Sequence, residues 1–311
     1  MILVAGSANL DFVVQASHIP APGETVLGRN FKTFPGGKGA NQAIACARGG
    51  GVATQMLLAL GDDAFAEPIA ASLRAAAVRM HTVRIADQPT GTAFICVSDD
   101  AENAITVAPG ANSWLRGPHL PALAGFSHLL LQLETPIETV TAFAAAAHAQ
   151  GVKVVLNAAP AQNLPAELLA LIDVLVVNAG ELAMLTNHRG GIAASLDQLS
   201  VPCVVVTLGH NGCCARADGV FFAQPAFPVT SVDTTAAGDT FCGVFVAALS
   251  QLQSLPQALR RAAAAGALAC TKLGAQSSIP AHADIEDFLQ TAPPTTSAHE
   301  LALKKFCGFP L

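Results

Sequence analysis

Charged residues are scarce in this chain. Asp, Glu, Lys and Arg make up 12% of its 311 residues, and 52% of the residues are apolar, whereas a typical globular domain carries about 25% charged residues. Such a bias can indicate a membrane protein, but no uninterrupted apolar run reaches the roughly 18 residues that a membrane-spanning helix needs. The apolar excess is largely alanine, which suits closely packed helices. We therefore expect no membrane partner.

Sequence signals for several other classes of protein are absent as well. The net charge is −6, whereas nucleic-acid binding needs a basic surface. The eight cysteines form no C-x-x-C pair and no Cys/His spacing of a zinc site, and most lie in apolar segments, which favours small core residues in a reducing compartment. The first residues lack the basic leader of a signal peptide. We therefore expect a cytoplasmic protein.

What the sequence does contain is an alternation of strand-like and helix-like segments. This order is typical of a mostly parallel sheet with helices on both faces. The predicted strands are 2–6, 53–60, 128–133, 152–157, 173–177 and 203–207. The predicted helices include 38–49, 64–78, 137–150, 165–172, 179–186, 239–252 and 256–272. The fold class is therefore predicted to be α/β.

Two segments interrupt this alternation. Residues 12–35 hold short strand-like pieces separated by proline and glycine, and residues 91–108 are typical of a hairpin with a charged turn. We interpret the two as a small β-sheet that forms a lid on a main domain of residues 1–291. The proline-rich residues that follow predict a C-terminal extension over 292–311, either frayed or docked.

The most informative stretch is Asp233–Asp239, of sequence DTTAAGD, which leads directly into a helix-like segment. Apolar residues recur with helical spacing from Phe241 onward, which places Asp239 in the first turn. Small residues just ahead of it let backbone N–H groups converge at the positive end of the helix, as in phosphate sites. An acidic residue in a first turn is ordinarily structural. Beside such a group of amides, we favour a carboxylate that orients a nucleophile for phosphoryl transfer.

A second glycine-rich stretch, Phe34–Ala43, also precedes a helix. It is not a Walker A loop, because Lys38 is followed by Gly39 rather than Ser or Thr and because Lys32 stands where that motif has a glycine. No G-x-G-x-x-G follows a predicted strand, which argues against a nicotinamide-dependent oxidoreductase. Glycines followed by Lys38 and Asn41 suit a polyhydroxyl ligand and a phosphate, although a plain loop-to-helix junction explains this stretch equally well.

Polar residues follow the first predicted strand, in the segment Gly6–Asp11. Polar side chains at the carboxyl end of a parallel strand point into the crevice where such folds bind ligands. Asn9 and Asp11 share one face by strand alternation, so we expect both in that crevice.

Together these motifs resemble those of the PfkB (ribokinase-like) carbohydrate kinases. The two signatures of that family are similar to Gly36–Asn41 and to Asp233–Asp239. The likeness extends in order from residue 1 to about residue 290 and includes Pro22–Val26, Leu131–Glu134 and Gly274–Gln276. It implies a three-layer α/β/α fold with a mostly parallel central sheet and a small β-sheet lid. It also implies a sugar kinase that uses ATP with Mg²⁺ and is activated by K⁺.

The resemblance implies roles for individual residues. Asp239 matches the catalytic base, and Ala236, Ala237 and Gly238 match the anion hole for the transferring phosphate. The positions that hold the sugar match Asn9, Asp11, Gly37, Lys38, Asn41, Glu134 and Asp239. Those that serve ATP and its magnesium match Asn178, Glu181, Thr207, Gly209, Asn211, Gly212 and Gly238. Those of the monovalent-cation site match Asp233, Thr235, Ala269, Lys272, Gly274 and Ser278.

Some of these positions also have an ordinary structural interpretation. Asn178 and Glu181 are spaced as an N-cap and its first-turn partner, and Glu134 is explained equally by a solvated strand end. Ala263 departs from the family pattern, because ribokinase-like enzymes often carry His or Asn beside the adenine there, so the nucleotide preference stays open. We interpret His210, in a predicted loop, as a solvated side chain.

We therefore expect an ATP-dependent kinase that phosphorylates the terminal hydroxyl of a pentose, with D-ribose as the first candidate. 2-Deoxyribose is the close alternative, and another sugar or a nucleoside is a further one. The alternative of another class is a catalytically silent sugar-binding regulator, which should lack either the base or the anion hole, whereas this sequence has both. The resemblance further implies a homodimer formed through the lid.

Overall fold

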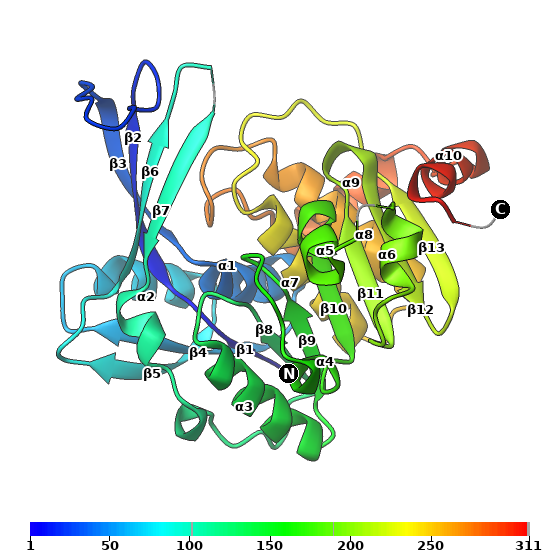
Figure 1. Cartoon of the computed structure of the whole chain (residues 1–311), viewed down its shortest axis with the longest axis horizontal. Helices are drawn as coiled ribbons and strands as arrows, with labels where there is room; N and C mark the ends of the chain where they lie inside the picture. Colours follow the sequence, from blue (N-terminus) through cyan, green and yellow to red (C-terminus); the bar gives the residue numbers. More distant parts are fainter. Residues whose placement is uncertain (101, 189, 310–311) are drawn as a thin grey trace.

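A nine-stranded sheet forms the centre of the molecule in the computed structural model, which describes residues 1–100, 102–188 and 190–309 (Figure 1). In sheet order its strands are β13 (Val220–Pro225), β12 (Gly212–Ala217), β11 (Cys203–Thr207), β10 (Val174–Asn178), β9 (Lys153–Asn157), β8 (His128–Leu131), β1 (Ile2–Ala5), β4 (Thr54–Gly61) and β5 (Arg79–Ile85). Neighbours are parallel except β11–β12 and β12–β13. The predicted mostly parallel sheet is confirmed.

Helices cover both faces of this sheet (Figure 1). One face packs against α1 (Lys38–Ile44), α2 (Ala66–Ala75), α7 (Ala237–Ser250) and α8 (Leu255–Ala269). The other face packs against α3 (Ile137–Ala149), α4 (Ala166–Leu169), α5 (Ala179–Thr186) and α6 (Ile192–Leu196). The strands are apolar on both faces because both faces are covered: in β1, Ile2 and Val4 join the first core and Leu3 the second.

A second sheet of four strands stands at one side of the molecule and is the predicted lid (Figure 1). Its order is β3 (Arg29–Gly36), β2 (Asn9–Gln15), β6 (Gly91–Val97) and β7 (Asn103–Ala108). The central strand β2 pairs antiparallel with β3 and parallel with β6, and β6 and β7 form the predicted hairpin.

The lid begins earlier than the sequence predicts. Strand β1 ends at Ala5, and β2 starts at Asn9, so Asn9 and Asp11 lie on the first lid strand rather than at the end of a core strand. The amide of Gly6 still donates to the carbonyl of Leu57 in the central sheet at 3.1 Å. The chain then passes from the central sheet to the lid sheet within three residues. Because side chains alternate in the same way in both sheets, the sequence does not indicate which sheet a residue joins.

The other differences lie at edges and ends. The predicted helix 38–49 is α1 followed by a π-helical turn over Ala45–Gly49. The strands β5, β12 and β13 and the helices α6, α9 (His282–Thr291) and α10 (Ser297–Cys307) are absent from the expected set. β5 and β13 are the two edge strands of the sheet and β12 lies next to β13. In all three strands several side chains are only partly buried, and the apolar pattern is correspondingly weak.

The last helix is docked on the body of the molecule. α10 packs against β13 at the edge of the sheet (Figure 1), and Leu303, Cys307 and Phe309 are buried in the core that also contains Cys214. All eight cysteines are free thiols, and five of them are buried, as the sequence predicts for core residues. Across the described ranges, no helix combines the length and the apolar character that a bilayer crossing requires.

Candidate active site

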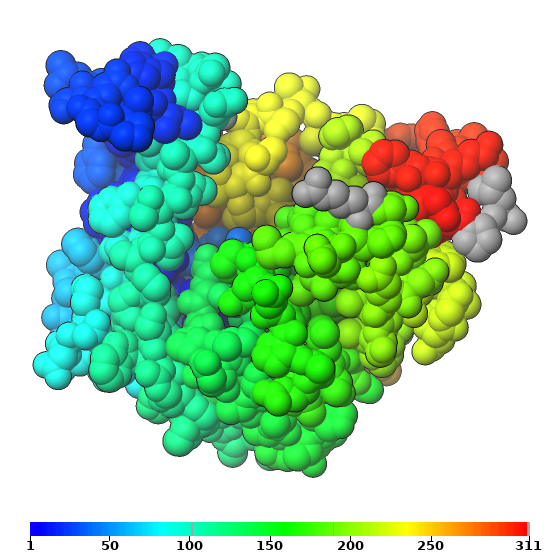
Figure 2. Space-filling view, viewed as in Figure 1, coloured from blue at the N-terminus to red at the C-terminus, as the bar shows by residue number. Residues whose placement is uncertain are grey.

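The sequence-predicted residues gather where the carboxyl ends of the core strands meet the lid. Figure 2 shows the lid standing away from the rest of the molecule, with a recess between it and the segments coloured yellow and orange. A hollow of about 230 Å³ in this region is lined by residues of α1, β10, α5 and α7, among them Lys38, Asn178, Glu181, Gly238 and Asp239. Ligands of open α/β sheets bind at this end of the strands.

Asp239 lies in the first turn of α7, as its sequence context predicts, and is only 8% exposed. Its two carboxylate oxygens accept hydrogen bonds from two neighbouring residues of α1: Asn41 Nδ2 donates to Oδ2 and Gln42 Nε2 donates to Oδ1, each at 2.9 Å. The other amide atom of Asn41, Oδ1, is buried and accepts no hydrogen bond from the described residues. An unused acceptor therefore lies beside a fully oriented carboxylate.

The turn before α7 is shaped for a ligand. Ala236 adopts a left-handed conformation with φ of 58°, which lets the chain enter the helix abruptly. The Ala237 amide donates to the Thr234 carbonyl at 3.2 Å, so one of the three predicted anion-hole donors is engaged within the turn. A side chain at Gly238 would meet no atom within 4 Å, so open space lies in front of this positive helix end.

Lys38 and Glu134 join the start of α1 to the end of β8. Glu134 Oε2 accepts hydrogen bonds from the Lys38 amide at 3.0 Å and from the Ser7 hydroxyl at 2.5 Å. The carboxylate of Asp239, and after it those of Glu134 and Glu181, raise the pKa of the Lys38 ammonium, although burial opposes them. Lys38 is therefore a cation in the field of three nearby carboxylates, a suitable partner for a phosphate group.

Asp11 lies on the lid strand β2 with its carboxylate against Gly36 of β3. A side chain at position 36 would lie 2.1 Å from Asp11 Oδ2, so only glycine leaves room for it. Burial, followed by the charges of Glu134 and Asp239, raises the pKa of Asp11 to about 7. The structure thus brings a poorly solvated carboxyl to the site, where sugar hydroxyls are natural hydrogen-bond partners.

Asn9 also lies in the buried part of β2, and another asparagine holds it. Asn112 Nδ2 donates to Asn9 Oδ1 at 2.8 Å and to the Ala8 carbonyl at 3.2 Å, and Asn112 Oδ1 accepts from the Ala8 amide at 3.1 Å. Gly37, with φ of 88°, has no room for a side chain, because a Cβ would lie 2.8 Å from the backbone of Ala8 and Asn9. The glycine-rich turn and the lid strand therefore pack backbone to backbone.

Asn178 and Glu181 form the capping box that their spacing predicts. Asn178 Oδ1 accepts from the Glu181 amide at 2.8 Å, and Glu181 Oε2 accepts from the Asn178 amide at 2.7 Å. The capping geometry does not exclude a ligand role, because both residues also line the hollow around Asp239. Burial raises the pKa of Glu181, against the hydrogen bond from Asn178 and the charge of Lys38.

A larger hollow of about 720 Å³ adjoins the first and shares Thr207, Thr234 and Gly238 with it. Of the predicted nucleotide residues it is lined by Thr207, Gly209, Gly212 and Gly238, whereas Asn211 is not among its lining residues. Ala263 lies in its wall, and its proximity to an adenine stays a prediction. His210, interpreted from the sequence as solvated, is exposed and also lines this hollow.

The predicted cation residues lie in two loops that Asp233 connects. Asp233 Oδ1 accepts from the Thr235 amide and Oδ2 from the Gly274 amide, each at 2.9 Å. Burial alone would raise the pKa of Asp233, but the hydrogen bonds from Thr235 and Gly274 outweigh it and lower the pKa. Ser278, fully buried, donates from its hydroxyl to the Ala275 carbonyl at 2.8 Å. Ala269 ends α8 and Lys272 follows it in the same loop.

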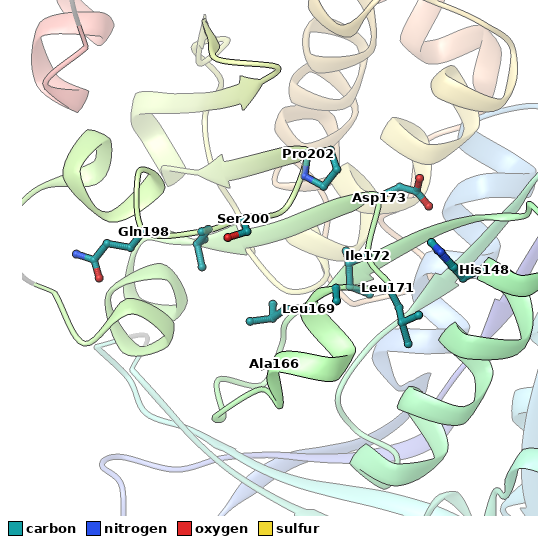
Figure 3. Close-up of a pocket in the computed structure, with 11 residues that line it drawn as sticks. His148, Ala166, Leu169, Leu171, Ile172, Asp173, Gln198, Ser200 and Pro202 are labelled. Atoms are coloured by element: carbon teal, nitrogen blue, oxygen red, sulfur yellow. The ribbon is translucent and has the colours of Figure 1, made fainter.

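Another hollow, of about 480 Å³, lies at the opposite end of the strands (Figure 3). It is lined by residues that precede β10 and β11, such as Asp173 and Pro202, together with His148 at the end of α3. None of the sequence-predicted site residues lies there.

Sequence reasoning missed several buried polar residues around the site, namely Ser7, Gln42, Asn112, Gln132 and Asn157. Gln42 directly follows the glycine-rich signature and Ser7 lies in the predicted crevice segment, so both were within reach. Asn112 contacts a residue 103 positions away and Gln132 one 90 positions away, and no local pattern indicates such contacts.

A buried carboxylate at a helix start, with a lysine and a turn of small residues beside it, is suited to phosphoryl transfer on an α/β fold. Residues 1–282 match the family model of the pfkB family carbohydrate kinases. The chain is 38% identical to the ribokinase of Haemophilus influenzae, an alignment that covers 94% of this chain and 99% of that protein. It is 32% identical to the deoxyribokinase of Salmonella typhi, with 93% and 98% covered. This chain therefore belongs to the pfkB family of carbohydrate kinases.

The three-dimensional fold also matches that of a relative of known structure. The structure of Arabidopsis thaliana ribokinase complexed with ribose and ATP matches with a TM-score of 0.84 and 31% identity, over 93% of this chain and 98% of that one. The predicted family and fold class are confirmed, whereas the roles of individual residues stay predictions.

Replacing Asp11 with asparagine tests how much stability the folded protein loses when this buried carboxyl is ionised. Because its folded pKa of about 7 exceeds the ordinary 3.8, the folded protein holds a proton that the unfolded chain has released, and stability falls as the pH rises between these values. We expect Asp11→Asn to raise the free energy of unfolding of the ligand-free protein by about 2 to 4 kcal/mol at pH 8. The gain should shrink as the pH falls toward 4, which urea denaturation across this range measures.

The exposed Asp197, far from the site, supplies the control. Asp197→Asn should change the stability by less than about 0.5 kcal/mol at either pH. A gain in Asp11→Asn that is the same at pH 4 and pH 8 would contradict the proposed origin of the effect.

Proposed function

We propose that this kinase transfers the γ-phosphate of ATP to the terminal hydroxyl of D-ribose. The observation that carries the proposal is Asp239, buried at the start of α7 with both carboxylate oxygens oriented from α1. The ribose-bound and ATP-bound relative of the same fold supports the choice of both substrates. The sugar would lie between the lid and α1, and the nucleotide in the adjoining 720 Å³ hollow.

In this reaction Asp239 accepts the proton of the sugar hydroxyl as the oxygen attacks phosphorus. Asn9 and Asp11 from the lid, with Gly37, Lys38, Asn41 and Glu134, hold the sugar so that this hydroxyl faces Asp239. The amides of Ala236, Ala237 and Gly238 and the Lys38 ammonium neutralise the charge that develops on the phosphate oxygens. For Ala237 this requires its turn hydrogen bond to Thr234 to lengthen when the phosphate binds.

Magnesium would accompany the nucleotide, and the residues of the site fit this arrangement. In the described part of the chain, no group of three or more His, Cys, Asp or Glu side chains could hold a metal ion by itself. Mg²⁺ is commonly held by substrate phosphates and one or two carboxylates, and Glu181 keeps one carboxylate oxygen outside its capping box. The ion would neutralise phosphate charge, with Glu181 and Asn178 on its protein side.

Replacing the base tests the proposed reaction. We expect Asp239→Asn to lower kcat by about 10²- to 10⁴-fold, because the neutral amide cannot accept the proton. ADP release should be measured for wild type and variant with ribose, 2-deoxyribose, fructose and a nucleoside. MgATP binding, measured by calorimetry, serves as the control for folding and should persist in the variant. Wild-type turnover in Asp239→Asn would contradict the mechanism.

2-Deoxyribose is the second candidate substrate, supported by the 32% identity to a deoxyribokinase over 93% of this chain. The same panel separates the two sugars through their kcat/KM values. Turnover of either sugar would also exclude a silent sugar-binding regulator.

The free state of all eight thiols supports a reducing, cytoplasmic location for the enzyme.

We further propose that K⁺ binds between the two loops that Asp233 connects, with carbonyls of Thr235, Ala269, Lys272 and Gly274 and with Ser278 nearby. Because the Thr235 loop leads directly into α7, a cation there would stabilise the anion hole. We expect kcat/KM to be about 5-fold or more higher in KCl than in tetramethylammonium chloride at equal ionic strength. Asp233→Asn should remove this difference, and equal rates of the wild type in both salts would contradict the site.

A homodimer through the lid is supported by an apolar row on the site-facing side of the lid sheet. Val13, Ile95 and Ile105 are register partners across β2, β6 and β7, and by strand alternation they share the face of Asp11. Ile105 is 55% exposed and Val107, on the same face, 42%. A second lid would cover this row and close the sugar site at the same time.

A charged side chain introduced into this apolar row of the lid should dissociate the proposed dimer. We expect the wild type to sediment as a dimer and Ile105→Glu as a monomer, because an unpaired carboxylate would be buried in the interface. Val220→Glu is the matched control, since Val220 is 54% exposed on β13, away from the lid. A wild-type monomer at micromolar concentration would contradict this dimer.

A further inference from the structure

A chain of hydrogen bonds between buried side-chain amides ends at Asp239, the proposed base. Gln132 Nε2 donates to Gln42 Oε1 at 2.6 Å. Gln42 Nε2 in turn donates to Asp239 Oδ1 and to Asn157 Oδ1, each at 2.9 Å, and Asn157 Nδ2 donates to the Val176 carbonyl at 3.1 Å. Gln42 is 0% exposed and Gln132 1%, so neither side chain is open to a ligand.

The order of donors and acceptors in this chain of hydrogen bonds favours one orientation for Gln42. In front of its side chain stand two acceptors, the Asp239 carboxylate and the Asn157 carbonyl, whose own NH₂ group is committed to Val176. On the other side of Gln42 stands the NH₂ group of Gln132, whose own Oε1 is buried and has no hydrogen-bond partner among the described residues. A flipped Gln42 would set oxygen against oxygen on one side and NH₂ against NH₂ on the other, each costing about 1 to 3 kcal/mol when buried. The two acceptors, Asp239 Oδ1 and Asn157 Oδ1, therefore favour the orientation in which the NH₂ group of Gln42 faces the carboxylate.

Two glycines make this arrangement possible. A side chain at Gly6 would occupy the place of Gln132 Oε1, 1.9 Å away. A side chain at Gly243, one turn after Asp239, would lie 2.6 Å from the Gln42 carbonyl oxygen and 2.5 Å from Ala45 Cβ. Helices α1 and α7 thus cross in contact at the residue that carries the amide, which sets the distance from Gln42 to Asp239.

We propose that Gln42, itself oriented by Gln132, is a positioning residue that fixes the rotamer of Asp239 for attack by the sugar hydroxyl. The proposal rests on the proposed function, in which Asp239 is the base. Asn41 is also bonded to Asp239, but it is one of the residues proposed to hold the sugar, whereas Gln42 is completely buried and has no proposed ligand. Loss of Gln42 should therefore change the rate of transfer and leave ligand binding nearly unchanged.

The decisive variant is Gln42→Met, which keeps the length and volume of the side chain and removes the N–H donor. We expect kcat to fall by about 10- to 100-fold, the equivalent of one hydrogen bond to a charged group. KM for the sugar and for MgATP should change by less than about 3-fold. A buried glutamine that only supports the fold would instead lower the thermal midpoint and leave kcat of the folded enzyme unchanged.

Thr139→Val is the matched control, because it removes a buried hydrogen bond, from Thr139 Oγ1 to the Leu115 carbonyl at 2.7 Å, in α3 on the other face of the sheet. It should lower the thermal midpoint and keep kcat within about 2-fold of the wild type. A kcat for Gln42→Met within 2-fold of the wild type, or a loss confined to KM, would overturn the proposal.

Gln132→Met extends the test, and it replaces Gln42→Met if that variant does not fold. It touches neither Asp239 nor any proposed ligand, and we expect a smaller fall in kcat of about 3- to 10-fold with unchanged KM. In the double variant the two effects should not add, since Gln132 acts through Gln42. Additive losses would overturn the role given to Gln132.

A readout without turnover separates this proposal from the proposed function. If the wild type phosphorylated no sugar of the panel, the proposed function would fail, but the contact would still be measurable. The side-chain amide protons of Gln42, followed by NMR, should exchange slowly in the wild type and much faster in Asp239→Ala. Exchange that is equally fast in both proteins would overturn the positioning contact itself.

Discussion

The crossing of α1 and α7 is the contact on which the site depends. The two helices are in direct contact at Gly243, because any side chain at this position would clash with Gln42 and Ala45. The thiol of Cys46 also donates a hydrogen bond to the Gly243 carbonyl at 3.3 Å. Each helix follows one of the two glycine-rich or small-residue signatures of the sequence. The crossing therefore brings together two motifs that lie about 200 residues apart and gives Asp239 its hydrogen-bond partners.

Charge is concentrated at this crossing in a chain that has little of it elsewhere. Asp11, Glu134, Glu181 and Asp239 surround the single ammonium of Lys38, so the ligand-free site carries more negative than positive charge. Burial of such groups opposes folding, and the raised pKa of Asp11 expresses this cost. Hydroxyl groups that donate to these carboxylates would relieve it, and ligand binding and stability are then linked through the same residues.

Much of this arrangement was accessible from the sequence, and the reason lies in local patterns. The apolar spacing from Phe241 and the small residues before Asp239 are local, and they place the carboxylate at the helix start. The capping box of Asn178 and Glu181 is equally local. Asp11 was placed on the right face but on the wrong sheet, since alternation is the same in both sheets. The contacts of Asn112 with Asn9 and of Gln132 with Gln42 join distant segments, and only the packed structure shows them.

The two halves of the cleft differ in the kind of recognition they offer. Around Asp239 the groups are charged or amide-bearing and are held by hydrogen bonds to neighbouring elements, so a ligand there meets polar partners that were oriented before it arrived. The adjoining hollow is lined mainly by small apolar residues, with hydroxyl groups from a few Ser and Thr and with the exposed His210 at its margin. Small apolar walls distinguish ligands by shape, which is a weaker discrimination than that of oriented polar groups left unpaired by a wrong substrate. In the proposed kinase, selectivity for the sugar would therefore exceed selectivity for the nucleobase, because Ala263 contributes no polar group to the wall where the base would lie.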